Sequence, residues 1–480
     1  MNGQLFFFFF PFLFPKFKPK ILPIYIVKPK VAFHTLGCKL NFTETSSLGK
    51  QFLERGYEVT DFDSPSDVII LNTCSVTERA DREARQWIRR ALRKSPNAFV
   101  AVIGCYAQLE PEEIASIEGV DVVLGASEKF RLFDIVPQFE KYAHPKIFVS
   151  DISDATDFGP AFSSEVGNRT RAFLKVQDGC DFNCSFCTIP LARGDSRSQS
   201  IAATVLQAQY LVENGYKEIV LTGVNVGDYG KRDGSSFFAL LQALENVNGI
   251  ARFRISSIEP NLLTQEIIDF ILSSEKFCNH FHIPLQSGSD TILRKMRRRY
   301  TANEYRNLLE YIKTKDENAG IGVDVIVGFP GETDELFTET YKFLTELPCS
   351  YLHVFTYSER PNTPANEFSE IIEPRIRFKR NEMLRNVSFK KRTAFYSRFA
   401  GSVMNVLIEH NPAEGGFSGL TTNYIRVNVN ANESQINTIQ PVLIEEMDAE
   451  HCNGVILAET FSPKKVVHQP TALHTFEVYQ

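Results

Sequence analysis

Apolar strand-like runs alternate with helical segments along most of this 480-residue chain, and that order restricts the fold more than any other feature. In the first part, helices are expected around 44–55 and at 78–94, between the runs KVAFHTLG, DVIILNTC, AFVAVIGC and DVVLGAS. Strands that alternate with helices form parallel sheets. We therefore expect an open parallel α/β domain over residues 29–142.

A second alternating series begins after the polar stretch 143–165, whose Gly, Pro, Ser and Asp content is typical of a linker. Its six strand-like runs are AFLKVQ, EIVLTG, RFRISS, HFHIP, GVDVIVG and YLHVFTYS. Six strand–helix units predict a partial (β/α)6 barrel of parallel strands surrounded by helices, over residues 166–398. The last of these helices is the charged segment 373–399.

Beyond that helix the pattern changes to short strands separated by turn residues, namely VMNVLIE, NYIRVNVN, PVLIEEM and GVILAE. Such spacing is typical of an all-β unit. The sequence therefore predicts a small β-barrel over 399–465, followed by a tail at 466–480.

Composition narrows the class of protein. A net charge of −6 argues against a generally basic protein that coats nucleic acid. Nine cysteines, an odd count with uneven spacing, favour metal ligation in a reducing cytoplasm over a secreted disulfide scaffold. The apolar run 5–14 is too short to span a bilayer and lacks a signal-peptide cleavage site. We expect residues 1–28 to be a disordered or wrongly included leader without a membrane role; a weak membrane anchor is the alternative.

Three cysteines follow the first predicted barrel strand in GCDFNCSFC: Cys180, Cys184 and Cys187. The carboxyl ends of parallel barrel strands carry the chemistry of such folds. Closely spaced thiolates suit the irons of an iron–sulfur cluster, and three of them leave one iron open. A structural zinc site is the alternative, but it normally requires four protein ligands.

A second set of cysteines, Cys38, Cys74 and Cys105, lies in HTLGCKLN, LNTCSVTERA and VIGCYAQ. Each follows a predicted parallel strand of the first domain. The carboxyl ends of strands in an open α/β sheet share one crevice. One such cysteine is most often a buried packing residue, but three in the same placement predict a second cluster with an open iron.

The motif GCDFNCSFC resembles the signature of the radical S-adenosylmethionine superfamily. The resemblance implies that the open iron chelates S-adenosylmethionine and that one electron cleaves it to a 5'-deoxyadenosyl radical, which removes a hydrogen atom from an unactivated carbon. By the same resemblance, five residues are candidates for cofactor binding, although core packing and tight turns would look the same: Phe186, Thr222, Gly223, Val325 and Gly328.

Together with the N-terminal segments and the tail, KVQDGCDFNCSFCTIPLARG resembles the methylthiotransferase family over nearly the whole chain after Lys30. The resemblance implies two [4Fe-4S] clusters, two S-adenosylmethionine molecules per turnover, an electron donor of flavodoxin or ferredoxin type, and a C-terminal TRAM-like RNA-binding barrel. The sulfur donor stays open.

The sequence around the motif is most similar to the family branch that acts on N6-threonylcarbamoyladenosine in tRNA. It implies methylthiolation at C2 of N6-threonylcarbamoyladenosine, at position 37 beside the anticodon. Alternative substrates are N6-isopentenyladenosine in tRNA and an aspartate of a ribosomal protein. A different class of function also stays open, an RNA-binding redox sensor that carries both clusters.

Basic and aromatic residues give candidates for RNA contact. RKMRRRY contains Arg297, Arg298 and Arg299 after a strand-end loop on the predicted active-site face, where we expect them to contact tRNA phosphates. In the tail, Tyr424 and Arg426 lie on one polar strand face that could stack or hydrogen-bond a base. Solvated surface faces are the alternative in both places.

Overall fold

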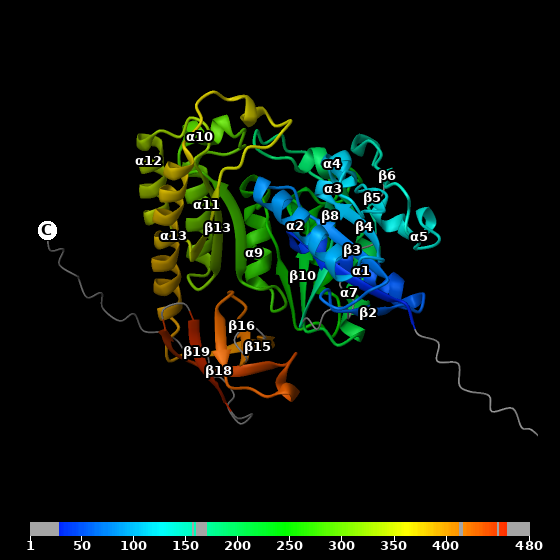
Figure 1. The fold of residues 1–480 in the computed structure, drawn as a ribbon. Helices are drawn as coiled ribbons and strands as arrows, with labels where there is room; N and C mark the ends of the chain where they lie inside the picture. Colours follow the sequence, from blue (N-terminus) through cyan, green and yellow to red (C-terminus); the bar gives the residue numbers. More distant parts are fainter. Residues whose placement is uncertain (1–27, 156–157, 160–169, 412–415, 449–450, 458–480) are drawn as a thin grey trace, which may run out of the picture.

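The computed structural model describes residues 28–155, 158–159, 170–411, 416–448 and 451–457 (Figure 1). The predicted leader as far as residue 27 and the predicted C-terminal tail lie outside these residues. No helix in the described part of the chain is long and apolar enough to cross a membrane.

The N-terminal domain contains one parallel sheet of six strands in the order β2-β1-β3-β4-β5-β6. The strands are β1 (Lys30–Thr35), β2 (Glu58–Thr60), β3 (Val68–Thr73), β4 (Phe99–Gly104), β5 (Val122–Leu124) and β6 (Lys146–Phe148). β6 pairs with β5, so the sheet continues past residue 142 into the stretch predicted to be a linker. The short edge strands β2 and β6 were not predicted because neither contains a continuous apolar run.

Helices cover both faces of this sheet, which is why β3 and β4 are apolar and buried along their whole length. Ile70 packs with Phe52 on one face, and Ile69 packs with Ile88 on the other. The elements between the strands are α1 (Lys39–Glu54), α2 (Glu78–Lys94), α3 (Cys105–Leu109), α4 (Pro111–Ala115), η1 (Lys129–Arg131), α5 (Leu132–Ile135) and η2 (Ile152–Asp154).

The central domain confirms the predicted partial barrel of six parallel strands. They are β7 (Arg171–Lys175), β10 (Glu218–Thr222), β11 (Arg252–Ile255), β12 (His280–Gln286), β13 (Gly320–Val327) and β14 (Tyr351–Thr356). The order is β7-β10-β11 in one half and β12-β13-β14 in the other, and a bridge between Ser257 and His282 joins the halves. A short pair, β8 (Gln177–Asp178) and β9 (Arg197–Ser198), lies beside the barrel.

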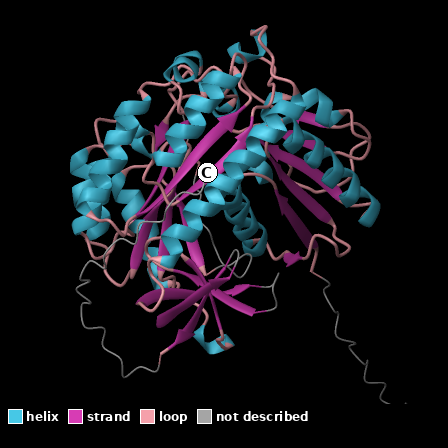
Figure 2. Ribbon diagram, turned by 90° about the vertical axis from the view of Figure 1, so that its left-hand side faces the viewer, coloured by secondary structure: helices cyan, strands magenta, loops and turns pink. Residues whose placement is uncertain are grey.

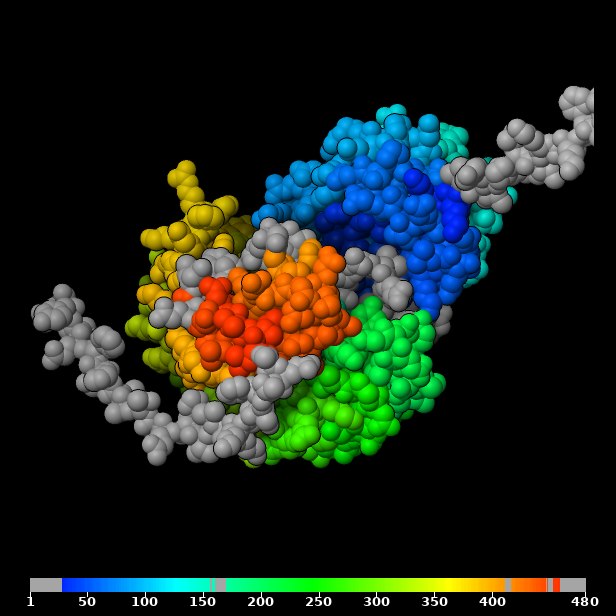
Figure 3. All heavy atoms as spheres, turned by 90° about the horizontal axis from the view of Figure 1, so that it is seen from below, coloured from blue at the N-terminus to red at the C-terminus, as the bar shows by residue number. Residues whose placement is uncertain are grey.

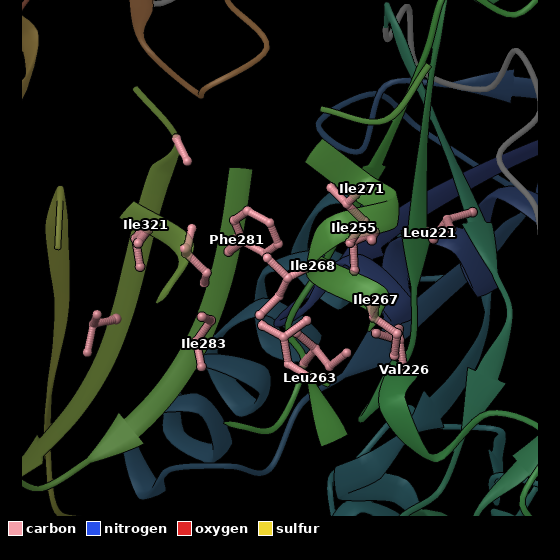
Figure 4. Close-up of a cluster of buried hydrophobic side chains, with 14 of the residues drawn as sticks. Leu221, Val226, Ile255, Leu263, Ile267, Ile268, Ile271, Phe281, Ile283 and Ile321 are labelled. Carbon is pink, nitrogen blue, oxygen red and sulfur yellow. The ribbon is translucent and has the colours of Figure 1, made fainter. Parts of the chain in front are cut away.

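Helices surround the outside of this partial barrel (Figure 2). The helical elements of this domain are α6 (Ile189–Arg193), α7 (Ile201–Glu213), η3 (Val226–Asp228), α8 (Phe237–Glu245), η4 (Pro260–Leu262), α9 (Gln265–Ser273), α10 (Asp290–Lys295), α11 (Ala302–Lys315), α12 (Asp334–Glu346), η5 (Pro364–Glu367) and α13 (Pro374–Ser397). Alternate strand residues such as Phe281, Ile283 and Ile321 pack against them in one apolar core (Figure 4). Because side chains alternate along a strand, the residues between these face the barrel interior.

The C-terminal unit is a closed five-stranded barrel, as predicted, and lies below the partial barrel in Figure 1. Its strands, in the order β15-β16-β17-β19-β18, are β15 (Val403–Asn411), β16 (Gly416–Leu420), β17 (Arg426–Val429), β18 (Ile439–Asp448) and β19 (His451–Ile456), with a turn η6 (Glu433–Gln435). β16 escaped prediction because its sequence, GFSGL, has no run of strand-forming residues.

Candidate active site

The loop that carries Cys180, Cys184 and Cys187 is pinned against the segment 194–196. The Cys180 amide donates to the carbonyl of Gly194 at 3.0 Å, and the Ser196 amide donates to Asp181 Oδ1 at 2.9 Å. Gly179 adopts a φ of +68°, and a Cβ there would lie 2.0 Å from the carbonyl oxygen of Asp195. Only glycine therefore permits this turn.

The three thiols of this loop, the radical trio, are held close together in a poorly solvated place. Burial, and then the neighbouring Cys187 and Cys184, raises the pKa of Cys180 to about 12. Burial also raises the pKa of Cys187 to about 12. A buried thiolate is unfavourable unless a cation or metal compensates it. Three mutually close, buried thiols therefore fit the irons of a cluster.

Arg298 is the charged neighbour of this trio. Its Nη1 donates to Cys184 Sγ at 3.0 Å, and its other side forms an ion pair with Glu259. The side chain is only 3% exposed. The prediction that Arg298 contacts RNA phosphate is therefore wrong. Arg297, with a φ of +59°, ends α10 and turns the chain so that Arg298 points inward, while Arg297 and Arg299 stay exposed.

Polar groups without partners gather at the carboxyl ends of β10 and β11. Within the described residues, Thr222 Oγ1, Asn225 Oδ1 and Ser256 Oγ are buried and make no hydrogen bond. Buried polar atoms in folded proteins are normally paired. Their position beside the cysteine loop fits a polar ligand such as the amino and carboxylate groups of S-adenosylmethionine.

The two glycines predicted to bind the cofactor are also required by the packing of the protein itself. A Cβ at Gly223 would lie 2.8 Å from Gln177 Oε1, and Gly328 has a φ of +75° and packs against Arg377. Each is therefore needed for packing whether or not a cofactor binds.

Of the other two candidates, Phe186 packs edge-on against Phe329, the neighbour of Gly328, at a centroid distance of 6.5 Å. The structure thus brings Phe186 and the Gly328 turn together. The side chain of Val325 faces the helices and is fully buried in the outer core. The predicted cofactor contact of Val325 is therefore limited to its backbone, because strand alternation points the side chain of its neighbour Ile326 inward instead.

The other three cysteines, the N-terminal trio, follow the adjacent strands β1, β3 and β4. Cys38 precedes α1, Cys74 follows β3, and Cys105 begins α3. Two glycines with positive φ show how closely the ends of these strands approach one another. A Cβ at Gly37 would lie 2.6 Å from Cys74 Cβ, and one at Gly104 would lie 2.4 Å from the carbonyl oxygen of Thr73.

The thiols of the N-terminal trio interact electrostatically. Burial raises the pKa of Cys74 to about 12, and Cys105 and Cys38 add to the increase. Burial likewise raises the pKa of Cys105. Like the radical trio, these thiols need metal to persist as thiolates. The residues present fit the predicted second cluster.

Residues next to the two trios meet at a junction between the N-terminal and central domains. Thr188, next to Cys187, donates its hydroxyl to the carbonyl of Ser75, next to Cys74, at 3.3 Å. Helix α6, which follows the radical trio, packs against α3, which begins with Cys105. Short connections therefore fix the distance and orientation between the two thiol sets.

A buried charge network beside this junction was not predicted. Arg193 of α6 donates from Nη1 to Glu44 and to Asp178, each at 2.9 Å. Lys129 lies 2.7 Å from Glu44, and Lys175 lies 2.7 Å from Asp178. Burial alone would raise the pKa of Glu44, but Arg193, Lys129 and Lys175 together lower it to about 2.

No local sequence signal marks this network, because its members come from separate elements of both domains. One local signal does exist for the thiols. Gly37, Gly104 and Gly179 each take a positive φ directly before a cysteine, so three of the six predicted cluster cysteines occur as Gly-Cys pairs.

The loop 420–424 of the C-terminal barrel docks on the amino-terminal ends of the central strands. Arg252 donates to the carbonyl of Leu420 at 2.8 Å, and Arg254 donates to the carbonyls of Thr421 and Thr422, each at 2.9 Å. Glu218 accepts from both arginines, at 2.5 and 2.9 Å. This buried ion group closes the bottom of the partial barrel.

Tyr424 belongs to this contact. Its ring stacks on His280 at 4.3 Å, with the guanidinium of Arg254 5.0 Å from the ring centre. It is therefore occupied between domains, and the prediction that it stacks an RNA base is wrong. Arg426 donates to Ser418 and its side chain is 42% exposed, so it stays accessible.

Comparisons with known sequences agree with this geometry. Residues 30–125 match the Uncharacterized protein family UPF0004, and residues 174–344 match the Radical SAM superfamily. The chain is 42% identical to the threonylcarbamoyladenosine tRNA methylthiotransferase MtaB of Bacillus subtilis, with 86% of this chain and 93% of the relative covered. For the enzyme of that name from Aquifex aeolicus the identity is 40%, over 83% and 96%.

The chain belongs to the methylthiotransferase family of radical S-adenosylmethionine enzymes. It is therefore an iron–sulfur enzyme that uses S-adenosylmethionine. A more distant relative is the tRNA-2-methylthio-N(6)-dimethylallyladenosine synthase of Methylacidiphilum infernorum, 30% identical over 87% of this chain and 92% of the relative. Among solved structures, the radical S-adenosylmethionine methyltransferase TsrM of Kitasatospora setae shares the fold, with a TM-score of 0.54 at 14% identity over 71% of this chain and 75% of that one.

Proposed function

We propose that this enzyme attaches a methylthio group to C2 of N6-threonylcarbamoyladenosine at position 37 of tRNA. Curated relatives that carry this activity in their names are 33–42% identical to the chain over most of its length. The structural observation that carries the proposal is the junction in which Thr188, next to the radical trio, contacts Ser75, next to the N-terminal trio. A reaction that joins carbon to a methylthio group needs a radical source and a sulfur carrier side by side.

In this proposal each trio holds one [4Fe-4S] cluster, and two S-adenosylmethionine molecules are used per turnover. When bound, these groups supply a methylated sulfur and a route to hydrogen abstraction from an unactivated carbon. The chain contributes position and charge. Burial raises the pKa of Cys184, and the Arg298 guanidinium opposes this increase and so favours the thiolate, while Thr222, Asn225 and Ser256 offer polar atoms to the cofactor.

Arg193 has a separate part in the proposal, because it lies where both domains meet. Its guanidinium is not a cluster ligand, but it interacts electrostatically with Cys105 and Cys38 and favours their thiolate forms. A cation that is buried and already paired with Glu44 and Asp178 can compensate a nearby cluster without leaving its place. It thereby ties the position of the N-terminal trio to that of α6.

The substrate base is unpaired in the anticodon loop, so it can enter the barrel without the cost of opening a duplex. Arg297 and Arg299 are exposed near the radical trio, and they remain the proposed phosphate contacts together with Arg426. A one-electron donor of flavodoxin or ferredoxin type and a cytoplasmic location complete the proposal.

Analysis of modified nucleosides by mass spectrometry tests the substrate. Cells that lack the gene should lose 2-methylthio-N6-threonylcarbamoyladenosine and accumulate the form without sulfur. The intact gene should restore the nucleoside, and the Cys184→Ala version should not. Loss of the isopentenyladenosine derivative or of the ribosomal aspartate modification instead would assign the enzyme to another branch of the family.

A further inference from the structure

Three polar side chains meet on the inner wall of the partial barrel. His282 of β12, Asp324 of β13 and His353 of β14 have ligand atoms that all lie within 4.8 Å of one another. His282 Nε2 and Asp324 Oδ1 are 2.6 Å apart, and the two imidazole rings are 5.2 Å apart. Their neighbours Ile283, Val323 and Leu352 pack outward against the helices, so this cluster faces the interior.

Lys39 of the N-terminal domain approaches the same space. It follows Cys38 of the N-terminal trio, and it is accessible to solvent. Lys39 interacts electrostatically with Tyr424 of the docked C-terminal barrel and with His280 and His353 of the wall, so its charge lies on this side of the partial barrel. Among the described residues, its backbone carbonyl accepts from Thr43, but its ammonium group forms no hydrogen bond or ion pair.

The C-terminal barrel closes the floor of this space only in part. Tyr424 and His280 stack at the bottom, and His280 is hydrogen-bonded to Tyr351 at 2.8 Å. Above His353 on the same face of β14, Phe355 is 50% exposed. From below, the surface is recessed where the blue N-terminal domain meets the orange C-terminal barrel (Figure 3).

The charges favour a particular class of ligand. Two histidines and an aspartate could hold a metal cation, but the unpaired ammonium of Lys39 opposes a second cation in the same space. The set instead combines donors and a cation, from Lys39 and the imidazoles, with an acceptor, the Asp324 carboxylate. It is complementary to a ligand that has both a carboxylate and N–H or O–H groups.

We propose that Lys39, His282, Asp324 and His353 bind the N6 threonylcarbamoyl substituent of the substrate and thereby determine specificity. This inference rests on the proposed function. The substituent offers a carboxylate to Lys39 and His353, and its ureido N–H and hydroxyl groups to Asp324, which His282 holds in place. An isopentenyl group offers no polar atom, so it would leave these groups without partners, which is the strongest basis for rejecting a ligand.

Binding of anticodon stem-loops by the anaerobically reconstituted enzyme tests the proposal. Three ligands differ only at position 37, which is adenosine, N6-threonylcarbamoyladenosine or the methyl ester of the latter. We expect Lys39→Met and His353→Leu to lower the preference for the threonylcarbamoyl ligand over adenosine about tenfold or more, about 1.4 kcal/mol per factor of ten. The affinity for the adenosine ligand should change little. Lys39→Arg should retain the preference.

The ester identifies the contact. For Lys39, the loss caused by Lys39→Met should be large for the free carboxylate and small for the ester, because the charge pair is already absent there. Lys315→Met, which removes a lysine on the outer helix α11, is the matched control and should show the wild-type preference. Iron content and the yield of 5'-deoxyadenosine without tRNA check that each variant is loaded.

Equal losses for the acid and its ester, or an unchanged preference in Lys39→Met and His353→Leu, would overturn the proposed pocket. Such a result leaves the proposed function intact if the wild-type enzyme still methylthiolates the threonylcarbamoyl stem-loop. If the wild-type enzyme fails to methylthiolate it while acting on an isopentenyladenosine stem-loop, the proposed function itself is wrong.

Discussion

The two cysteine trios reach similar surroundings by different routes. The radical trio lies within one loop, Cys180 to Cys187, that folds back on residues 194–196. The N-terminal trio is assembled from the ends of three strands, with Cys38 and Cys105 separated by three strands and two helices in sequence. The first site depends on a local turn, and the second depends on correct pairing of the whole sheet. Their shared junction makes each depend on the other for position.

The largest expected effect separates the two trios by chemistry. Replacing Cys180, Cys184 and Cys187 with Ala should abolish formation of 5'-deoxyadenosine, because no ligand then holds the radical cluster. Replacing Cys38, Cys74 and Cys105 with Ala should leave cofactor cleavage without tRNA product. Anaerobic reconstitution, iron analysis and product detection by mass spectrometry measure both, and each triple variant should retain the iron of the intact trio. Product from the N-terminal variant at wild-type yield would remove its role in sulfur transfer.

The two sites also differ in how far the sequence predicted them. The spacing in GCDFNCSFC is local and could be read directly, and the strand-end positions of Cys38, Cys74 and Cys105 followed from the predicted parallel sheet. The strands β2 and β6 were missed because edge strands need little apolar sequence. Side-chain direction was predicted least well. Arg298 turns inward because the backbone of Arg297 adopts the left-handed conformation. Tyr424 is covered because the C-terminal barrel docks on the central domain and stacks its ring on His280.

The next effect tests the junction that the two trios share. Arg193→Ala removes the partner of Glu44 and Asp178 in a buried network and should cost about 3–5 kcal/mol of stability. Denaturant unfolding of the apo protein measures it. Arg90→Ala is the control, because Arg90 pairs with Asp63 on the surface, with side chains 42% and 48% exposed, and should cost about 0–1 kcal/mol. Equal losses in both variants would show that the junction adds no special stability.

A third test compares two glycines of similar φ. Gly37→Ala places a methyl group 2.6 Å from Cys74 Cβ, whereas Gly56→Ala, at a φ of +83°, meets nothing within 4 Å. Both share the strain of the left-handed region, about 1–2 kcal/mol. Only Gly37→Ala should lose the iron of the N-terminal trio while the radical trio stays loaded. Iron analysis and Mössbauer spectra of the two variants measure the difference, and loss of iron in both would attribute it to strain alone.

The smallest expected effect separates the inward arginine of the radical site from its exposed neighbours. Each lost phosphate contact lowers the slope of log affinity against log salt by about 0.7–0.9. Arg297→Gln and Arg299→Gln should each flatten the slope for tRNA by that amount, because both side chains are exposed. Arg298→Gln should leave the slope unchanged and instead reduce the yield of 5'-deoxyadenosine, because it withdraws a cation 3.0 Å from Cys184 Sγ and leaves Glu259 unpaired. Filter binding over a range of salt concentrations gives the slopes. An unchanged slope in the Arg297 and Arg299 variants would identify these as solvated surface charges and would move the tRNA contact to another face of the enzyme.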